Sequence, residues 1–320
     1  MRTLASLLVG VLVAAAASVA IAGTSGIPTT ITVALPRSAA AVPFELGVQR
    51  GIFKANGVNV RLVLVDSTAQ AIAAVTAGKA EIGVGDPTSI MVYANAKHAP
   101  LRLVSGVTTT KRGFTGLLAT GGIKSAAGTF GMKVGVPELD GLDRLATQVW
   151  LDGNGGDTNS VTFVQVASRN ARRALAKGYV NAVLVEQPVL ASLATAPGVR
   201  SLGDVENGLL GSQAPDTVAF STSTYLRSSA GSPAAVRFVR ALGKAIAYAS
   251  GHRSAVTPIL TSVAGWPAAL AGKMTPQYSA TLGTFTLEQI AESEYAYQLT
   301  GAVQPDVAAL IWSKAPQRDT

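Results

Sequence analysis

Short apolar runs along the chain alternate with polar loops and with stretches of helical periodicity. Between Ile31 and Pro87 one order repeats: a β-rich apolar run, a loop of Pro, Ser, Gly and Asp, and a helical stretch. Pro43 at one helical stretch, and Ser67 three residues before Gln70 at the next, are typical helix starts. We expect strands at 31–35, 60–65 and 81–84. Their alternation with helices predicts βαβ units and a mainly parallel sheet.

The same order restarts at Lys133 and predicts a second α/β unit. Its expected strands are 133–136, 161–166 and 182–185, and its expected helices run from 143 to about 152 and from 169 to 177. Two β-rich stretches, 114–119 and 217–221, would carry the chain out to this unit and back. From Ser232 the pattern is helical, with a long helix to about Ser250 and a capping box at 286–289. We therefore predict one lobe from 23–115 plus 217–320 and a second lobe from 116–216.

The first 22 residues have the features of a cleaved export signal. A positive start at Arg2 precedes the apolar run 4–19, and Ala20-Ile21-Ala22 forms a small-residue cleavage site. An uncleaved membrane anchor is the alternative, but the run is mostly Ala and Val, and no Lys or Arg follows it before Arg37. The chain has no cysteine, so it lacks the residue that is acylated in a lipoprotein. We expect a soluble protein of the periplasm.

Composition removes several classes of chemistry. Without cysteine there is no disulfide, no thiolate metal site and no catalytic thiol. The two histidines, His98 and His252, are too few for most histidine-based metal sites and leave little material for a Ser-His-Asp triad. We interpret both as surface or loop residues. The 26 basic residues exceed the 18 acidic ones, yet they are scattered and not interleaved with aromatics, which disfavours nucleic acid as a partner. We expect no metal, no cofactor and no enzymatic activity.

Polar loops follow five of the predicted strands. They lie at 37–43, 66–68, 85–89, 137–143 and 186–188. In open α/β sheets ligands bind outside the carboxyl ends of the strands, where helix N-termini offer backbone N–H groups. Each loop alone is equally typical of a turn or a helix cap. Five such loops from two lobes predict a ligand cleft between the lobes.

Four segments of the chain resemble one known family. They are ITVALPRSAAAVPFELGVQRGIFKANGVNVRLVLVDSTAQAIAAVTAGKAEIGVGDPTSI, GIKSAAGTFGMKVGVP, ALAKGYVNAVLVEQP and YQLTGAVQPDV. The chain resembles periplasmic substrate-binding proteins of ABC importers, of the nitrate, sulfonate and taurine type, with the related thiamine-pyrimidine binders. The resemblance implies the type II fold, in which two α/β lobes joined by a two-strand hinge close on a small molecule. It also implies a monomer that delivers its ligand to a permease in the inner membrane.

The resemblance places ligand contacts in both lobes. In the first lobe they fall on Ser38, Ala39, Val42, Pro43, Ser67, Thr68, Gly85, Asp86, Pro87 and Thr88. In the second lobe they fall on Asp140, Gly141, Leu142, Asp143 and Glu186. Arg37 joins this set because it can pair with an acidic group of the ligand.

One departure from the family bears on the ligand. Where the family often has Gly-Ser-Thr-Ser, this chain has Asp140-Gly-Leu-Asp143, which removes hydroxyl donors and adds two carboxylates. We expect Asp143 to cap the following helix. With Glu138 and Glu186 nearby, the second lobe favours a neutral or amine-bearing ligand, whereas Arg37 favours an acidic group. An aminosulfonate would satisfy both, and a sulfonate or a pyrimidine-like compound stays open.

Two other functions share this fold. A ligand-sensing periplasmic protein that signals through a membrane receptor would have the same sequence features, so it remains an alternative. A pyrimidine-forming enzyme of the same fold would need a cysteine-rich motif and an active histidine, and the chain has no cysteine. A transcription regulator is disfavoured by the export signal. The sequence favours solute binding for import.

Overall fold

The computed structural model describes residues 29–301 and 303–318. The expected signal peptide, residues 1–22, lies outside the described residues. Within the described ranges, no helix combines the length and the apolar character needed to cross a membrane.

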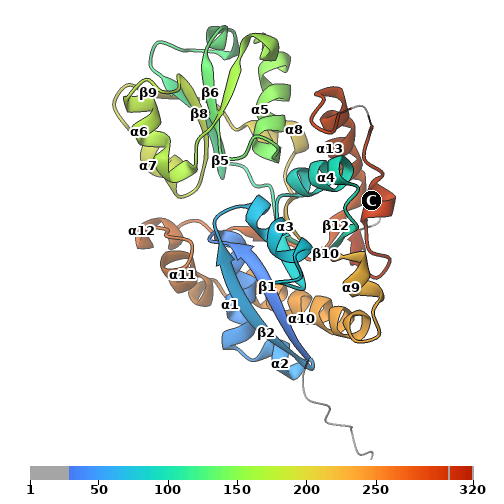
Figure 1. Ribbon diagram of the computed structural model, residues 1–320. Helices are drawn as coiled ribbons and strands as arrows, with labels where there is room; N and C mark the ends of the chain where they lie inside the picture. The colour runs from blue at the N-terminus through green and yellow to red at the C-terminus, as the bar shows by residue number, and fades with distance from the viewer. Residues whose placement is uncertain (1–28, 302, 319–320) are drawn as a thin grey trace, which may run out of the picture.

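Two sheets organise the chain, one in each half of the molecule (Figure 1). We call the part around the six-stranded sheet lobe I and the part around the five-stranded sheet lobe II. The sheet of lobe I has the order β11-β4-β10-β3-β1-β2, and that of lobe II has the order β7-β6-β8-β5-β9. The strands of lobe I are β1 (Thr29–Pro36), β2 (Val58–Val65), β3 (Ile82–Gly85), β4 (Leu101–Thr109), β10 (Pro215–Thr222) and β11 (Gln277–Tyr278), beside a small pair of β12 (Leu282–Gly283) and β13 (Gln317–Arg318). The strands of lobe II are β5 (Thr115–Thr120), β6 (Lys133–Val136), β7 (Thr162–Gln165), β8 (Ala182–Glu186) and β9 (Val199–Gly203).

Helices flank both sheets. Those of lobe I are α1 (Val42–Gln49), α2 (Ile52–Ala55), α3 (Thr68–Thr76), α4 (Pro87–Lys97), α9 (Ser223–Arg227), α10 (Gly231–Gly251), α11 (Arg253–Ser262), α12 (Ala268–Ala271), α13 (Thr284–Ala296) and α14 (Val307–Leu310). Those of lobe II are α5 (Leu142–Gly153), α6 (Ala171–Ala176), α7 (Val189–Leu193) and α8 (Val205–Leu210). Short 3-10 turns lie at Ala39–Ala41, Ala126–Thr129, Thr158–Ser160 and Ser168–Asn170.

The predicted α/β fold with two sheets and flanking helices is confirmed, but both sheets are mixed. In lobe I β1 pairs in parallel with β2 and β3, whereas β10 is antiparallel to β3 and β4. In lobe II β6 is parallel to β7 and β8, whereas β5 is antiparallel to β8 and β9. Strands β5 and β10 enter their sheets directly from the segments that connect the lobes. Their direction is therefore set by where the chain arrives and not by a helical crossover, which parallel pairing requires.

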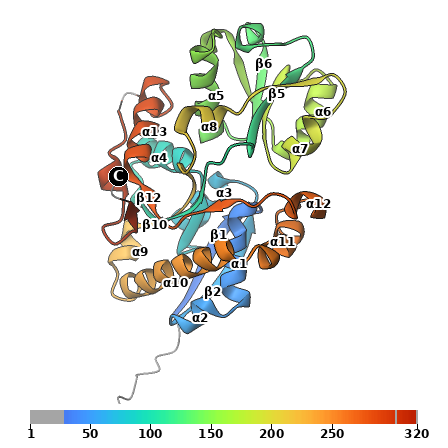
Figure 2. The ribbon, with the colours of Figure 1, turned by 180° about the vertical axis from the view of Figure 1, so that it is seen from behind.

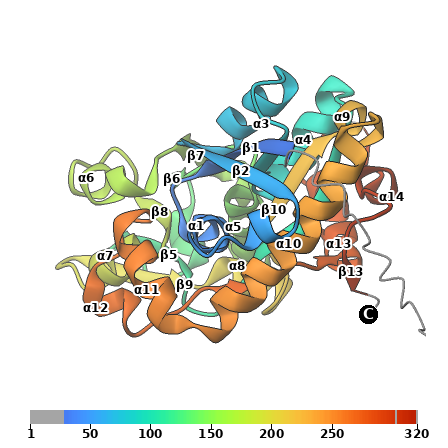
Figure 3. The ribbon, with the colours of Figure 1, turned by 90° about the horizontal axis from the view of Figure 1, so that it is seen from below.

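The core of lobe I lies on both faces of its sheet. Ile31, Val33 and Leu35 of β1 pack on one face with Phe44 of α1 and Phe238 of α10. Helix α10 runs along this side of the lobe (Figure 3). Residues of α3 and α4 pack on the opposite face. Because helices cover both faces, the central strands read as nearly continuous apolar runs.

Helix α5 packs its apolar side chains into the cores of both lobes. Its Ala146 and Leu151 are buried in the core of lobe II. Its Leu145 instead belongs to an apolar cluster with Leu287 and Ile290 of α13 in lobe I. The lobes therefore meet through apolar packing on one side as well as through the connecting chain.

Two connecting segments pass between the lobes and lie side by side (Figure 2). The first is 110–114, between β4 and β5, and the second is 211–214, between α8 and β10. The Thr110 backbone N–H donates to the Ala214 carbonyl at 2.8 Å, and the Gln213 N–H donates to the Thr110 carbonyl at 3.0 Å. The Thr110 hydroxyl adds a bond of 2.7 Å to the Gly211 carbonyl. This pairing fixes the two segments to each other where the lobes join.

Two helix starts differ from those expected at the sequence level. Helix α13 begins at Thr284 behind Gly283, with no side-chain cap, so the capping box predicted at 286–289 is wrong. The chain enters α13 directly from β12, and this pairing places the helix start earlier. Helix α5 begins at Leu142 with Gly141 at its N-cap, so the prediction that Asp143 caps it is also wrong. Asp143 lies one residue inside the helix.

Candidate functional site

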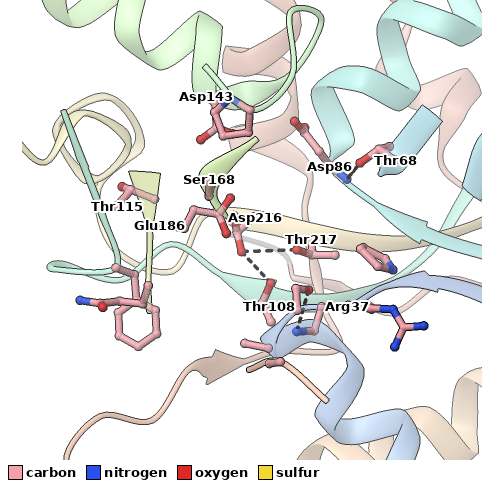
Figure 4. A pocket seen from close by; sticks show the side chains of 18 of the residues that line it. Arg37, Thr68, Asp86, Thr108, Thr115, Asp143, Ser168, Glu186, Asp216 and Thr217 are labelled. Atoms are coloured by element: carbon pink, nitrogen blue, oxygen red, sulfur yellow. Dashed lines mark hydrogen bonds between the residues drawn. The ribbon is translucent and has the colours of Figure 1, made fainter. Parts of the chain in front are cut away.

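A cavity of about 760 Å³ lies between the lobes and is lined by both (Figure 4). This volume is in the range of small-molecule sites in proteins. Lobe I contributes the ends of β1 and β2, the start of α3, the β4–β10 region and the loop at 264–266. Lobe II contributes the loop before α5, the 3-10 turn that precedes α6, the loop after β8 and the start of α8. The cavity thus lies at the carboxyl ends of β1, β2, β3, β6 and β8, where the sequence predicts it.

Helix starts of lobe I present polar groups to the cavity. The Ser38 hydroxyl accepts from the Ala40 N–H at 3.3 Å, and the Ser67 hydroxyl accepts from the Gln70 N–H at 3.2 Å. The Asp86 carboxylate accepts from the Thr88 N–H at 2.7 Å at the start of α4. These bonds satisfy helix N–H groups that have no partner within the helix.

Two carboxylates, one from each lobe, accept hydrogen bonds from the opposite lobe across the cleft. Asp86 of lobe I accepts from the Leu142 N–H of α5 at 2.6 Å. Glu138 of lobe II accepts from the Thr68 N–H of α3 at 2.9 Å and from the Ser89 hydroxyl at 2.9 Å. Each lobe therefore supplies the acceptor for a helix N-terminus of the other lobe, where the helix dipole favours negative charge. Asp86 takes the place at α5 that the sequence assigned to Asp143.

The hydrogen bond from the Leu142 N–H to Asp86 is possible because the chain has a glycine at position 141. A Cβ at Gly141 would lie 2.6 Å from the Asp86 carboxylate oxygen Oδ2 and 3.2 Å from the Cβ of Glu138. The absence of a side chain lets the Asp86 carboxylate reach the start of α5.

A second group of carboxylates lies deeper in the cavity. Asp143 in the first turn of α5 and Glu206 in the first turn of α8 are both buried, with 8% and 5% of their surfaces exposed. Asp216, at the start of β10, accepts from the Thr108 hydroxyl at 2.7 Å and from the Thr217 hydroxyl at 3.4 Å. Glu186 at the end of β8 reaches into the open cavity, and the cavity side chains are shown in Figure 4. Four carboxylates from three elements of lobe II and one strand of lobe I thus face one space.

The proximity of these groups changes their acidity. Burial raises the pKa of Asp143 to about 6; a hydrogen bond with Glu206 opposes that rise, and the charges of Asp216 and Glu138 add to it. Burial, followed by the charges of Asp143 and Asp216, raises the pKa of Glu206 well above its usual range.

The pKa values of Glu186 and Asp216 are also raised. Glu186 is accessible to solvent within the cavity but is surrounded by both walls. This separation from bulk water, followed by the charges of Asp143 and Asp216, raises its pKa well above the usual range. Burial also raises the pKa of Asp216, although the hydroxyls of Thr108 and Thr217 lower it in part. The cavity therefore brings together several carboxyl groups whose ionisation is unfavourable because of burial and mutual repulsion.

Ten of the sixteen residues predicted to contact a ligand line the cavity. They are Arg37, Ser38, Ala39, Ser67, Thr68, Gly85, Asp86, Leu142, Asp143 and Glu186. Six do not: Val42, Pro43, Pro87, Thr88 and Gly141 are buried away from the cavity, and Asp140 is exposed on the surface. The first four point into the core because they lie one or two residues inside their helices. Arg37 is exposed, and its guanidinium is directed away from the carboxylates (Figure 4).

Several lining residues were not predicted. Glu206 follows the antiparallel strand β9, and Thr108, Asp216 and Thr217 lie on β4 and β10, which lead into and out of the connecting segments. The rule applied to the sequence considers only loops that follow parallel strands. A signal did exist, since Asp216 and Thr217 are polar residues at the start of an otherwise apolar run.

Comparisons with known proteins agree with this arrangement. The family model described as NMT1/THI5 like matches residues 40–256. The fold is similar to that of the alkanesulfonate-binding protein SsuA of Xanthomonas axonopodis pv. citri bound to MOPS, with a TM-score of 0.74, 19% identity, and coverage of 90% of this chain and 99% of that one. It is also similar to the periplasmic nitrate-binding protein NrtA of Synechocystis PCC 6803, with a TM-score of 0.73, 10% identity, and coverage of 89% and 86%.

A third similar structure is the periplasmic aliphatic sulphonate binding protein SsuA of Escherichia coli, with a TM-score of 0.70, 17% identity, and coverage of 92% of this chain and 94% of that one. No curated protein sequence matches the chain. At these identities the solved structures establish the periplasmic-binding-protein fold, and the family model covers more than half of the chain. The chain therefore belongs to the NMT1/THI5-like family.

Proposed function

We propose that this protein is the solute-binding component of an ABC importer. It captures a small organic nitrogen or sulfur compound between its lobes and delivers it to a permease in the inner membrane. The observation that carries this proposal is the cavity of about 760 Å³, which polar groups of both lobes line. The family membership supports it, as do the similar structures, which are those of an alkanesulfonate-binding and a nitrate-binding protein.

The arrangement suits binding rather than catalysis. A ligand in the cavity would touch Ser38, Ser67 and Thr68 on one wall and Asp143 and Glu186 on the other. Contact with both walls gives the ligand a higher affinity for the closed form than for an open one, which is what drives closure. The signal peptide predicted at residues 1–22 would export the protein to the periplasm as a monomer.

Native mass spectrometry of the mature protein, purified without refolding, tests this function. We expect a mass above that of the chain, and we expect this excess to disappear after denaturation. Incubation of the emptied protein with a small-molecule extract of the producing cells should restore the excess mass. An empty protein in both experiments, together with no change in melting temperature in the extract, would contradict solute binding.

A further inference from the structure

We propose that the solute is an organic cation, whose ammonium or amidinium nitrogen lies among Asp143, Glu206 and Asp216, with Glu186 beside it. This inference rests on the proposed function, because it names the ligand class of the same cavity.

The charges that line the cavity are unbalanced. Seven acidic residues line it: Asp66, Asp86, Glu138, Asp143, Glu186, Glu206 and Asp216. The three basic lining residues do not compensate the deep group. Arg37 and Arg169 are exposed, and the Lys111 ammonium donates to the Thr275 carbonyl at 2.7 Å. A protein with an excess of basic residues overall thus keeps its ligand cavity acidic.

The carboxylates of Asp86 and Glu138 are already used in contacts between the lobes. Asp86 binds the start of α5, and Glu138 binds the start of α3 and the Ser89 hydroxyl. Asp143 differs, because its Oδ1 oxygen has no hydrogen-bond partner within the protein. Only 8% of the residue is exposed, so bulk water does not replace that partner. A buried carboxylate oxygen without a partner costs free energy that a bound donor would recover.

A second polar atom independently indicates a bound partner. The Thr109 hydroxyl oxygen, on a residue that lines the cavity and is 8% exposed, also has no hydrogen-bond partner. Thr109 precedes the connecting segment on β4 and is not part of the acidic group. Its hydroxyl and the Asp143 carboxylate together offer acceptors on lobe I and on lobe II. A nitrogen donor can bind to either acceptor, whereas a sulfonate or nitrate oxygen would face Asp143 as like charge.

The cavity geometry favours an organic cation over a metal ion. Among the described residues, no group of three or more acidic or histidine side chains is arranged to hold a metal. The carboxylates are instead spread around a large space. Phe114 and Trp266, whose ring centroids lie 5.9 Å apart, line the same cavity and provide an apolar wall for the carbon skeleton. The Lys111 ammonium already lies over the Phe114 ring, 5.2 Å from its centroid, so this wall would contact the carbon skeleton and not the cationic nitrogen.

A matched series of small probes tests the inference. Benzylamine and benzamidine are cations, benzenesulfonate and benzoate are anions, and benzamide is uncharged, although all share one ring. Their binding is measured by calorimetry and thermal shift at pH 8, beside native mass spectrometry of the protein incubated with cell extract. We expect the cations to bind at least tenfold more tightly than the anions, and the extract to supply a nitrogen-bearing cation.

Variants then locate the site of the positive charge. Asp143→Asn should lower the affinity for the cations at least tenfold, and Glu186→Gln, which changes a side chain open to the cavity, provides a second test that does not depend on the buried pair. Glu292→Gln on the exposed side of α13 removes the same charge far from the cavity and should change affinity less than twofold.

The outcomes separate the inference from the function. Tighter binding of a sulfonate, a carboxylate or an uncharged compound, or unchanged cation affinity in both cavity variants, would overturn the cationic ligand and leave solute binding intact. No bound mass from extract and no response to any probe would remove the proposed function, and the inference with it.

Discussion

At the scale of single residues, the central feature is a set of carboxyl groups held close together, with no ion pair to a basic side chain among the described residues. Asp143 and Glu206 lie in the first turns of α5 and α8, where a helix N-terminus favours negative charge. Burial and mutual repulsion oppose that preference and raise the pKa of both groups. The grouping of these carboxyl groups therefore costs the folded protein free energy, and a ligand that neutralises them would gain affinity.

We expect Asp143→Asn to stabilise the ligand-free protein in a pH-dependent way. The pKa of Asp143 rises from its ordinary value of 3.8 to about 6 in the folded protein. The folded state therefore holds this proton more firmly than the unfolded state, and the resulting stability is full below the ordinary value and is lost as the pH rises through about 6. At pH 8 the variant should be more stable than the native chain, on the order of 2 kcal/mol.

Urea unfolding at pH 4.5 and pH 8 measures this effect. The difference in free energy of unfolding between variant and native chain should shrink at pH 4.5, where Asp143 is protonated. The other carboxyl groups around Asp143 are those of Glu206, Glu138, Glu186 and Asp216. Glu292→Gln is the control, with no such difference. An equal gain at both pH values would contradict the assignment.

At the scale of elements, helix starts from one lobe are bound by carboxylates from the other. The bonds from Leu142 to Asp86 and from Thr68 to Glu138 hold α5 and α3 across the cleft at 2.6 and 2.9 Å. Apolar packing of Leu145 with the α13 cluster supports the same side. Hydrogen bonds at two helix N-termini and apolar packing thus hold the lobes together on this side.

We expect Glu138→Ala to weaken the closed form. The change removes the acceptor of the Thr68 N–H and the nearer acceptor of the Ser89 hydroxyl, which keeps only the Asp86 carboxylate at 3.5 Å. We expect a cost of about 1–3 kcal/mol. Small-angle X-ray scattering should show a larger radius of gyration for the variant. Asp140→Ala, two residues away and exposed, should leave both the radius and the stability unchanged within about 0.5 kcal/mol. The same radius for both variants would show that these hydrogen bonds do not hold the lobes.

At the scale of the whole molecule, two short segments connect two independently built sheets. Thr110 is the residue that joins these segments most directly. Its hydroxyl donates to the Gly211 carbonyl at 2.7 Å and accepts from the Ala214 N–H at 3.1 Å, in addition to its backbone bonds. This pairing, together with the apolar packing of α5 and the hydrogen bonds across the cleft, sets the relative position of the lobes.

We expect Thr110→Val to loosen the connection between the lobes. The replacement has a similar shape but leaves the Gly211 carbonyl and the Ala214 N–H without their partner, at a cost of about 1–3 kcal/mol. Differential scanning calorimetry should show a lower melting temperature and a broader transition as the lobes unfold less cooperatively. Thr109→Val is the matched control, because that hydroxyl has no partner to lose. Equal effects of the two changes would contradict the role of Thr110.

The sequence by itself determined the elements and the edge where the site lies. Strands such as 31–35 and 133–136 and helix starts such as Ser67 follow from local patterns, because periodicity and capping act over a few residues. The loops after the parallel strands follow from the same local patterns. Because ligands bind at the carboxyl ends of such strands, ten of the predicted residues line the cavity.

Only the tertiary structure decided which carboxylates face each other. Asp216 lies on β10 and Glu206 on α8, far along the chain from Asp143, and their neighbourhood depends on how the connecting segments set the lobes. The cap of α5 likewise comes from Asp86 of the other lobe and could not be read from the residues around Asp143. Local sequence specifies backbone conformation, whereas charges interact through space at distances that only the folded chain brings about.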